Sequence, residues 1–453
     1  MSGDAWPGPG HVPVVHNRWK DMPPAADPPT VSVIVCHYEQ HDDLDRLLAG
    51  IALQRGPIDL KEVIVVDDGS TEAPAPPSSA GTVPVTVLCQ ADHGVRPAAA
   101  RNLGVRHSRG EVLVFLDADT TPGPETVARL AALPAVAPDA FTVGRRHHVD
   151  LEGWSPEATT NWLAGRGPAP SRLEDPAWLR AAYERTQDLV AVDDRCYQYV
   201  IGAVMATSRR FFDHLRGFDA SITTYGGEDW ELAYRAYAAG GVLAHCPDAD
   251  AFHNGGDWGE RNHHRGRKND ERLEVARTIP GATDGLIGPW ATLLVTLRTQ
   301  GWPLDTTVAV IAALLCDGGT EARISVIDPP AGLAGVVAAD SRVLLAPHGP
   351  ATVTRALRHL DMAQPLKVGE GSLAALAALV APGAAGQVEL VDRGEVVATV
   401  SSTRACARAR RWTDRLGGYE QALDELFGRE RQSLPPRVAR LDAVPDLNDS
   451  FPR

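Results

Sequence analysis

The sequence has few cysteines, no excess of positive charge and no long apolar run, and each absence excludes a class of protein. The six cysteines among 453 residues are scattered and form no C-x-x-C pair, which argues against zinc knuckles and a disulfide scaffold and favours a reducing compartment. The formal net charge of −14 argues against nucleic acid as the main partner. The remaining composition, 44% hydrophobic and 23% charged, is typical of a soluble globular protein.

Targeting signals are missing as well. The N-terminus has no basic region followed by an apolar core, so the sequence predicts no signal peptide. The most apolar later stretch, residues 306–316, is too short to span a bilayer. We therefore expect a cytoplasmic protein without a transmembrane segment.

Changes in composition along the chain predict three parts. Residues 1–29 are rich in proline and polar groups and are expected to form an extended, loosely attached arm. Residues 30–275 alternate strand-like and helix-like segments, which predicts an α/β domain with an open, mostly parallel sheet. Within it, residues 150–195 lack clear periodicity and are interpreted as an insertion over the site. Residues 285–453 are expected to form a smaller C-terminal α/β domain of unknown role.

Apolar periodicity and helix punctuation predict the individual elements. In the first domain we expect strands at 30–38, 61–71, 83–90, 112–116, 197–207 and 242–254, and helices at 41–54, 96–108 and 225–241. The polar, basic stretch at 257–272 is predicted to be a loop. In the second domain we expect strands at 306–316, 322–330 and 342–347, helices at 352–362 and 372–380, and a hairpin at 387–403.

Polar side chains stand where several predicted elements of the first domain begin or end. In open α/β sheets the carboxyl ends of the strands meet along one edge, where ligands bind. The residues at these positions are Asp67 with Asp68, Asp117 with Asp119, Glu228 with Asp229, and His253. One acidic residue at a strand end is unremarkable, but polar residues at the starts or ends of four elements that meet along one edge of the sheet indicate a site.

Asp117 and Asp119 are the first candidates for chemistry. They directly follow the buried strand at 112–116 and are separated only by Ala118. Two carboxylates at such a place suit a divalent cation and the phosphates that it carries. A simple strand-end turn is the alternative, because Asp and the following Thr-Thr-Pro are ordinary turn residues.

The motifs taken together resemble those of one enzyme family. VSVIVCHYEQ, VIVVDDGST, GVRPAAARNLGV, VLVFLDADTTP, YGGEDWELAYR and FHN occur in the order found in family 2 glycosyltransferases with the GT-A fold, over residues 30–270. The Gly-Gly-Glu-Asp helix start and the strand-end histidine are also similar to those of galactosyl- and N-acetylgalactosaminyltransferases. The resemblance implies a GT-A nucleotide-diphospho-sugar transferase domain at 30–275, with the 150–195 insertion near the acceptor site.

On the donor side, the resemblance implies roles for individual residues. Asp68 would accept a hydrogen bond from the nucleobase, which favours uracil, whereas Asp67 could cap the Asp-Gly-Ser turn. Tyr38 would line the nucleoside pocket unless it fills the core. Arg101 would reach the diphosphate or order the D-x-D loop, with a solvated helix-face arginine as the alternative. Asp117 would contact ribose or sugar hydroxyls, or the metal through water.

Asp119 matches the family's main metal-ligand position, and His253 is the expected second ligand. An imidazole is a good ligand for Mn²⁺, whereas Mg²⁺ prefers oxygen, so we expect Mn²⁺ with Mg²⁺ as the alternative. The cation would stabilise the charge that develops on the departing nucleoside diphosphate. A histidine satisfied by ordinary hydrogen bonds is the competing interpretation. The basic stretch at 261–265 would close over the diphosphate or form a solvated loop.

Asp229 is the candidate general base, because an acceptor hydroxyl attacks well only when a carboxylate takes its proton. Its place in the first turn of a helix is expected to keep it ionised at neutral pH. Glu228 would bind hydroxyls of the acceptor or donor. An Asp here, rather than the Asn of retaining relatives, favours inversion. The alternative is that both acids merely complement the helix dipole.

The sequence therefore predicts a metal-dependent hexosyltransferase that moves one sugar from a UDP-sugar to an acceptor hydroxyl with inversion. The absence of a Q-x-x-R-W signature favours a single transfer. A peptide, a natural product and a glycan all stay open as acceptors, and homodimerisation stays open too. The alternatives are a retaining transferase and a non-catalytic nucleotide-sugar or partner-binding protein with a decayed transferase domain.

Overall fold

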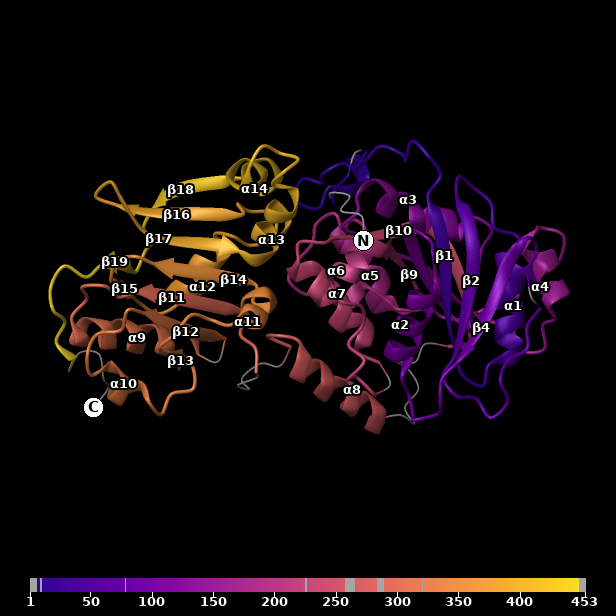
Figure 1. Ribbon diagram of the computed structural model, residues 1–453, viewed down its shortest axis with the longest axis horizontal. Coiled ribbons are helices and arrows are strands. Elements are labelled where there is room, and N and C mark those ends of the chain that lie inside the picture. Colours follow the sequence, from indigo (N-terminus) through magenta and orange to yellow (C-terminus); the bar gives the residue numbers. More distant parts are fainter. Residues whose placement is uncertain are drawn as a thin grey trace. The chain divides into compact units, whose positions relative to one another are not determined.

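The computed structural model describes residues 6–8, 10–77, 79–224, 226–256, 265–282, 289–319 and 321–447. The chain divides into two compact units, and both combine helices with a sheet (Figure 1). Unit 1 comprises Met1–Tyr237 and Gly241–Val275, and unit 2 comprises Ala238–Gly240 and Ala276–Arg453.

Unit 1 is built on a ten-stranded sheet with the order β3-β4-β2-β1-β5-β9-β7-β10-β6, and β8 pairs with β7. The strands from β4 to β5 are parallel, β9 runs antiparallel to β5 and β7, and β7 is parallel to β10. The predicted open, mostly parallel α/β sheet is confirmed. Its strands are β1 (Thr30–His37), β2 (Asp59–Asp67), β3 (Ser79–Ala80), β4 (Val83–Cys89), β5 (Val112–Asp117), β6 (Thr120–Pro122), β7 (Ala140–Asp150), β8 (Ser171–Arg172), β9 (Val204–Ser208) and β10 (Val242–Asn254).

Helices cover both faces of this sheet. On one face, Val33 of β1 shares a hydrophobic cluster with Leu44 and Leu47 of α1. On the other, Gly104 of α2 lies so close to Ile34 that an added Cβ would come 2.5 Å from Ile34 Cγ2. Because side chains alternate along a strand, β1 is buried on both faces. The helices are α1 (His41–Ile51), α2 (Pro97–His107), α3 (Thr126–Val136), α4 (Pro156–Leu163), α5 (Ala177–Thr186), α6 (Arg209–His214), α7 (Glu228–Ala238) and α8 (Arg265–Thr278), with 3-10 turns η1 (Trp19–Asp21) and η2 (Cys196–Tyr199).

The strand register brings polar strand ends to one edge of the sheet. Asp67, the last residue of β2, is paired with His37 of β1. Asp117, the last residue of β5, is in register with Cys36 on the other side of β1. The carboxyl ends of three adjacent parallel strands therefore meet, as expected where such sheets bind ligands.

The N-terminal segment 6–29 departs from the prediction of a loosely attached arm. Asn17 is 1% exposed, and its Nδ2 donates to the backbone oxygen of Leu243 in β10 at 2.7 Å. The indole nitrogen of Trp19 donates to the backbone oxygen of Asp188 at 3.0 Å. A buried amide is stable only when its hydrogen bonds are made, so these contacts anchor the segment to unit 1.

Two further segments of unit 1 differ from the prediction. The loop expected at 257–272 is helical from Arg265 onward as α8, while residues 257–264 lie outside the described residues. Its charged composition concealed the helix, because no apolar stripe marks a 3.6-residue period. The 150–195 insertion contains α4 and α5, and α3 and β7 were not predicted.

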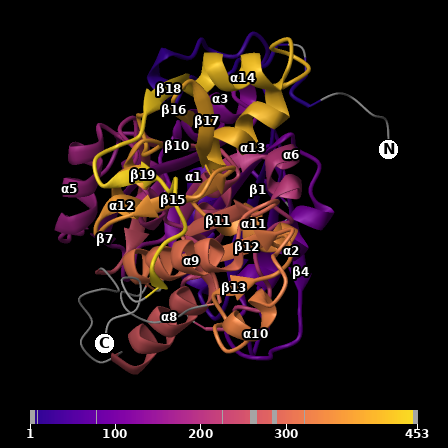
Figure 2. The ribbon, with the colours of Figure 1, turned by 90° about the vertical axis from the view of Figure 1, so that its left-hand side faces the viewer.

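Unit 2 contains a seven-stranded sheet with the order β13-β12-β11-β14-β17-β16-β18, and β15 pairs separately with β19. The strands from β13 to β14 are parallel, and β17 is antiparallel to both of its neighbours. Helix α9 contacts β12, β15 and α12 (Figures 1 and 2). The strands are β11 (Leu293–Arg298), β12 (Ala322–Ile327), β13 (Val343–Leu344), β14 (Arg358–Met362), β15 (Leu366–Val368), β16 (Gln387–Asp392), β17 (Glu395–Ser402), β18 (Arg429–Ser433) and β19 (Val438–Arg440). The helices are α9 (Leu304–Gly318), α10 (Leu333–Val337), α11 (Pro350–Arg355), α12 (Ser372–Ala378), α13 (Thr403–Trp412) and α14 (Tyr419–Phe427).

The predictions for unit 2 have mixed outcomes. The strand expected at 306–316 is instead the helix α9, because a continuous apolar run fits either structure and only its length separates them. The helix expected at 352–362 is divided between α11 and β14. The hairpin at 387–403 is confirmed, with positive φ at Arg393 and Gly394 as a tight turn requires. None of the helices in the described ranges is long and apolar enough to cross a membrane.

Candidate active site

A carboxylate and an imidazole meet where β6 and β10 pair. His253 of β10 lies opposite Thr120 in the antiparallel ladder, which brings its ring next to Asp119. Nδ1 of His253 lies 3.2 Å from Oδ1 of Asp119, and among the described residues no hydrogen bond satisfies this buried nitrogen. Gln40 donates to the other oxygen of Asp119 at 3.1 Å. The structure thus brings together the two residues predicted as metal ligands.

The donor set of this pair fits a divalent cation. Burial raises the pKa of Asp119, but His253 and the hydrogen bond from Gln40 outweigh burial, so the pKa lies below its usual value. Asp119 is therefore ionised at neutral pH, as a metal ligand must be. No group of three or more His, Cys, Asp or Glu side chains within the described ranges could hold a metal. One oxygen and one nitrogen ligand suit a cation whose other ligands are phosphate and water oxygens.

Arg101 joins two of the candidate carboxylates. It is 3% exposed, so the alternative of a solvated arginine on the helix surface is excluded. Its Nη2 donates to Asp117 and its Nη1 to Glu228, both at 2.7 Å. Asp117 is therefore held by Arg101 and is not grouped with Asp119 and His253. These two ion pairs connect α2, the end of β5 and the start of α7.

Asp229 is held by the backbone in the first turn of α7. Gly202 donates its N–H to Oδ2 at 2.9 Å, and Trp230 donates its N–H to Oδ1 at 2.8 Å. Burial and then the charge of Glu228 raise the pKa of Asp229 from 3.8 to about 7, against the effect of these N–H groups. The expectation that the helix N-terminus keeps Asp229 ionised is wrong, because burial and a like charge outweigh it. A carboxyl group that titrates near neutral pH is suited to general base catalysis.

Gly202 and Ala203 form a backbone link between these acids. A Cβ on Gly202 would lie 3.2 Å from Cβ of Asp229 and 3.3 Å from Nη2 of Arg101, so a side chain there would displace them. The backbone oxygen of Ala203 accepts the N–H of Asp117 at 3.3 Å. Sequence reasoning missed both residues, since neither carries a chemical group that marks a site.

Asp68 and Tyr38 follow the ends of β2 and β1. Asp68 is 5% exposed, and its carboxylate accepts Nε2 of Gln90 at 2.5 Å and the backbone N–H of Arg96 at 2.7 Å. Tyr38 is 49% exposed, which excludes the alternative that it fills the core. Both side chains are therefore at the edge where the strands end, and one of them is open to solvent.

Asp67 caps the Asp-Gly-Ser turn, which is the structural role suggested for it from the sequence. It accepts the backbone N–H of Ser70 at 3.1 Å and the Ser70 hydroxyl at 2.5 Å, which closes the Asp-Gly-Ser turn. Nδ1 of His37 lies 2.9 Å from Oδ1 of Asp67. Burial lowers the pKa of His37 despite this partner, so the neutral ring donates from Nδ1. A histidine and an acid at the ends of adjacent strands are the signal by which this pair could have been found.

Helix α8 lies against the start of α7. The guanidinium carbon of Arg272 lies 5.3 Å from the centre of the Trp230 ring. A Cβ on Gly226 would come 3.1 Å from Cδ of Glu271, whose pKa is raised by burial. These contacts were missed because a loop was expected here. Of the basic stretch at 261–265, residues 261–264 lie outside the described residues, and the Arg265 side chain is not described either.

Two family models match the chain, both within unit 1. Residues 32–196 match "Glycosyl transferase family 2", and residues 193–253 match "N-terminal domain of galactosyltransferase". Among curated proteins, the chain is 31% identical over 226 residues to validoxylamine A glucosyltransferase of Streptomyces hygroscopicus subsp. jinggangensis, covering 47% of this chain and 52% of that protein. It is 27% identical over 256 residues to N-acetylgalactosaminyltransferase 6 of Drosophila melanogaster. This match covers 52% of this chain and 35% of that protein.

The chain therefore spans about half the length of these relatives or less. It is also 26% identical over 240 residues to chondroitin synthase of Escherichia coli, covering 49% of this chain and 34% of that protein. Among solved structures, a mannosyltransferase from Pyrobaculum calidifontis in complex with GDP-Man and Mn²⁺ matches 58% of this chain and 66% of its own, with 22% identity and a TM-score of 0.37.

Proposed function

We propose that unit 1 is a family 2 glycosyltransferase domain with the GT-A fold, and that it moves one sugar from a UDP-sugar to an acceptor hydroxyl with the help of a divalent cation. One observation carries this proposal. Arg101 ties the D-x-D segment to the start of α7 through Asp117 and Glu228, so the Asp119–His253 pair and Asp229 belong to one site.

Asp229 is the proposed base. Its pKa of about 7 allows it to be ionised in a large part of the molecules at neutral pH and still to accept a proton readily. The N–H groups of Gly202 and Trp230 fix the carboxylate in position. In the transfer, Asp229 would take the proton of the acceptor hydroxyl as its oxygen attacks the sugar carbon, which contributes about 10²–10⁴-fold to the rate. Attack from the face opposite the leaving group inverts the anomeric configuration.

Asp119 and His253 would hold the cation, with Mn²⁺ favoured by the imidazole ligand. When bound, the cation would offset the negative charge of the nucleoside diphosphate. Arg101 would keep Asp117 in place for the hydroxyls of the donor, because Arg101 itself is fixed by its buried ion pair with Glu228, while the Asp117 side chain is 34% exposed. Gln40 would orient the Asp119 carboxylate.

The uridine preference rests on Asp68, and the surface around Tyr38 would contact the nucleoside. Asp68 already accepts three hydrogen bonds, from Gln90 and from the backbone and the guanidinium of Arg96, and a carboxylate has lone pairs for about four. It can therefore accept the N–H of a uracil ring as well. The acceptor is proposed to be a small hydroxyl-bearing compound or glycan, in line with the names of the glucosyltransferase and chondroitin synthase relatives.

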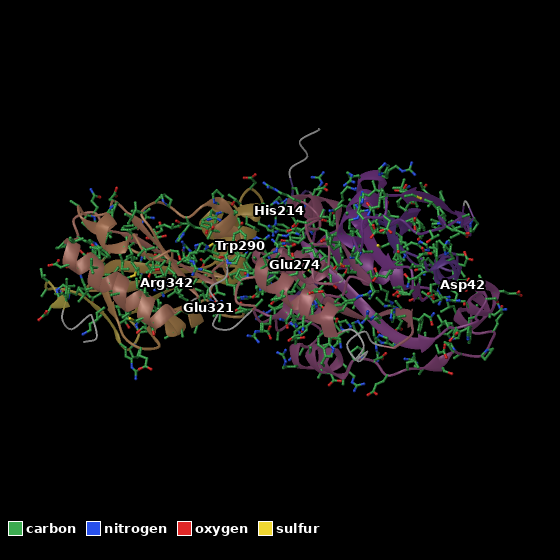
Figure 3. All side chains as sticks on the ribbon, turned by 90° about the horizontal axis from the view of Figure 1, so that it is seen from below. Asp42, His214, Glu274, Trp290, Glu321 and Arg342 are labelled. Atoms are coloured by element: carbon green, nitrogen blue, oxygen red, sulfur yellow. The ribbon has the colours of Figure 1, made fainter. Side chains whose placement is uncertain are left out.

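Isothermal titration with UDP tests the donor site. We expect binding that requires Mn²⁺, disappears with EDTA and is lost in His253→Ala. A matched control is His214→Ala, which removes an exposed histidine at the end of α6 (Figure 3) and should bind UDP normally. Binding of a different nucleoside diphosphate would overturn the role of Asp68, and no nucleotide binding would overturn the proposed function.

The stereochemistry of transfer tests the role of Asp229. With an α-linked UDP-sugar as donor, NMR of the first product formed should show the β-anomer. An α-product would contradict single displacement and favour a retaining transferase.

A further inference from the structure

The sheets of the two units have the same topology. The order β13-β12-β11-β14-β17-β16-β18 in unit 2 matches the order β4-β2-β1-β5-β9-β7-β10 in unit 1, and Figure 1 shows the strands of unit 2 side by side in this order. In each unit four parallel strands are followed by one strand, β9 or β17, that is antiparallel to both of its neighbours. The chain also visits the matching strands in the same sequence, so unit 2 repeats the strand path of unit 1.

The irregular end of the sheet is repeated as well. In unit 1 the pairing of β10 with β7 is interrupted between Cys246 and Asp250, and the last part of β10 pairs antiparallel with the short strand β6. In unit 2 the same path is divided into β18, which pairs with β16, and β19, which pairs antiparallel with the short strand β15. Strands β18 and β19 together therefore correspond to β10.

A shared helix cap aligns the two units residue by residue. The side chain of Ser208 caps α6, and the side chain of Ser402 caps α13 in the same way. These serines pair with Val112 of β5 and Arg358 of β14. Strands β6 and β15 then begin at the same interval, eight residues after these partners. The helix cap and the short strand thus give the same alignment.

This alignment identifies the counterparts of the proposed metal ligands. Pro365 directly precedes β15, as Asp119 directly precedes β6. Arg440 lies opposite the first residue of β15, as His253 lies opposite the first residue of β6. A proline side chain has no ligand atom, and a guanidinium group has no acceptor. Unit 2 therefore lacks the pair that would hold a cation in unit 1.

Arg440 brings a positive charge of its own to this place. Its Nη1 donates to Glu395 at 3.0 Å, and its Nη2 donates to Gln364 at 3.3 Å. The charge that a cation would bring to unit 1 is thus supplied in unit 2 by a side chain, and Glu395 neutralises it. This edge of unit 2 is satisfied by internal bonds.

The counterparts of the other candidate residues are changed too. Helices α7 and α14 both begin directly after two glycines with positive φ, which places Glu420 at the position of Asp229. The Glu420 side chain is 76% exposed, and its Oε2 lies 3.1 Å from Nη1 of Arg429, so it is not an enclosed carboxyl group like that of Asp229. By the strand register, the two glycines and the proline that begins both α2 and α11, the counterparts of Asp68, Asp117, Arg101 and Glu228 are Pro329, Ala363, Thr354 and Tyr419.

We propose that unit 2 is a second copy of the fold of unit 1 in which the donor site has been lost, so that the chain binds one nucleotide and one cation and unit 2 has a non-catalytic role. The core has kept its pattern, since Val295 and Leu360 are 0% and 1% exposed, like Val33 and Val114 at the matching positions of unit 1. Packing determines a fold, whereas activity depends on particular side chains. The count of one nucleotide rests on the proposed function, while the repeat rests on strand order and register.

Isothermal titration of the full chain with UDP in the presence of Mn²⁺ counts the donor sites. We expect one UDP per chain, loss of binding in His253→Ala and unchanged binding in Arg440→Ala, the matched change in unit 2. Two UDP per chain would overturn the inference. Binding that persists in His253→Ala and disappears when Arg440→Ala is added would overturn it as well, because unit 2 would then hold a nucleotide.

Crystals of the full chain grown without nucleotide test the repeat separately from the proposed function. Unit 2 should superpose on unit 1 with Pro365 at the place of Asp119 and Arg440 at the place of His253. Other residues at these two places would overturn the inference. If the superposition holds and the unchanged chain binds no UDP, the repeat is supported and the proposed function of unit 1 is overturned.

Discussion

The two units of the molecule differ in how deeply their carboxylates are buried. In unit 1, Asp67, Asp68 and Glu228 are 2%, 5% and 5% exposed. No Asp or Glu in the described part of unit 2 is buried in this way, and its ion pairs resemble that of Arg298 with Asp361, whose side chains are 58% and 37% exposed. Burial of an ionised carboxylate is unfavourable unless it is paired. A buried acid therefore needs a partner, such as Ser70 for Asp67 in a turn or Arg101 for Glu228 in the candidate site.

The largest expected effect is on catalysis. Asp229→Asn removes the proposed base while keeping nearly the same shape, so kcat should fall by about 10²–10⁴-fold, with UDP affinity unchanged. Initial rates of sugar transfer and a UDP titration measure the two quantities. The matched change in unit 2, Asp361→Asn, should change neither kcat nor the affinity for UDP. A normal rate in Asp229→Asn would mean that the base is elsewhere.

Loss of the buried arginine should destabilise unit 1 strongly. Arg101→Met leaves Asp117 and Glu228 without their partner, and breaking a buried pair such as that with Glu228 costs about 3–5 kcal/mol. Chemical denaturation followed by circular dichroism gives the free energy of unfolding. A change below about 1 kcal/mol, the range of surface pairs, would show that the Arg101 network is solvated.

The same Asp229→Asn variant should be more stable than the unchanged chain above neutral pH. In the folded protein the pKa of Asp229 is raised from 3.8 to about 7, so the stability from its neutral form is fully present below pH 3.8 and is lost as pH rises through 7. The variant avoids this loss, which amounts to at most about 4 kcal/mol. Melting curves at pH 5 and pH 8 should show the larger gain at pH 8. An equal gain at both values would contradict the raised pKa.

The pH profile of the reaction reports the same group. Because the base works only when deprotonated, kcat/KM should rise with pH and reach half its maximum near the pKa of about 7. Glu228→Gln removes the like charge that helps to raise the pKa of Asp229, so the remaining activity should have its midpoint at lower pH. An unshifted midpoint would show that Glu228 does not act on Asp229 through its charge.

The smallest effect is expected for the surface pair of unit 2. Arg298→Met removes two hydrogen bonds to Asp361, as many ion-pair bonds as Arg101 makes, yet solvent replaces them. The free energy of unfolding should change by less than about 1 kcal/mol. A loss as large as that of Arg101→Met would remove the distinction between the two units.

The sheet of unit 1 and the candidate residues at its strand ends could be predicted from the sequence because they depend on local signals. Strands β1, β2 and β5 are apolar runs that end in polar residues, and Asp119 and His253 are chemically conspicuous at such ends. The continuous apolar run of α9 misled the prediction, since such a run fits a strand as well as a helix and only its length favours a helix.

What could not be predicted depends on contacts between distant residues. The link from Gly202 to Asp229 joins residues 27 positions apart, and neither its existence nor its effect on the carboxyl group is visible in the local pattern. The pKa of Asp229 follows from burial and from Glu228, whereas the sequence shows only a first-turn acid. The pairing of His37 with Asp67 depends likewise on the register of two strands.

The anchoring of Asn17 also constrains how the protein is made. Its side-chain partner, the backbone oxygen of Leu243, lies 226 residues later in the chain. At a translation rate of about 5–20 residues per second, the N-terminal segment leaves the ribosome on the order of 10–45 s before that partner exists. During this interval its hydrophobic cluster is incomplete, because Val14 packs with Leu133 and Val136 and also with Val242 and Ala244 of β10, so unit 1 becomes complete only after β10 has been synthesised. Ribosome pausing before this strand would prolong exposure, while pausing after it would not.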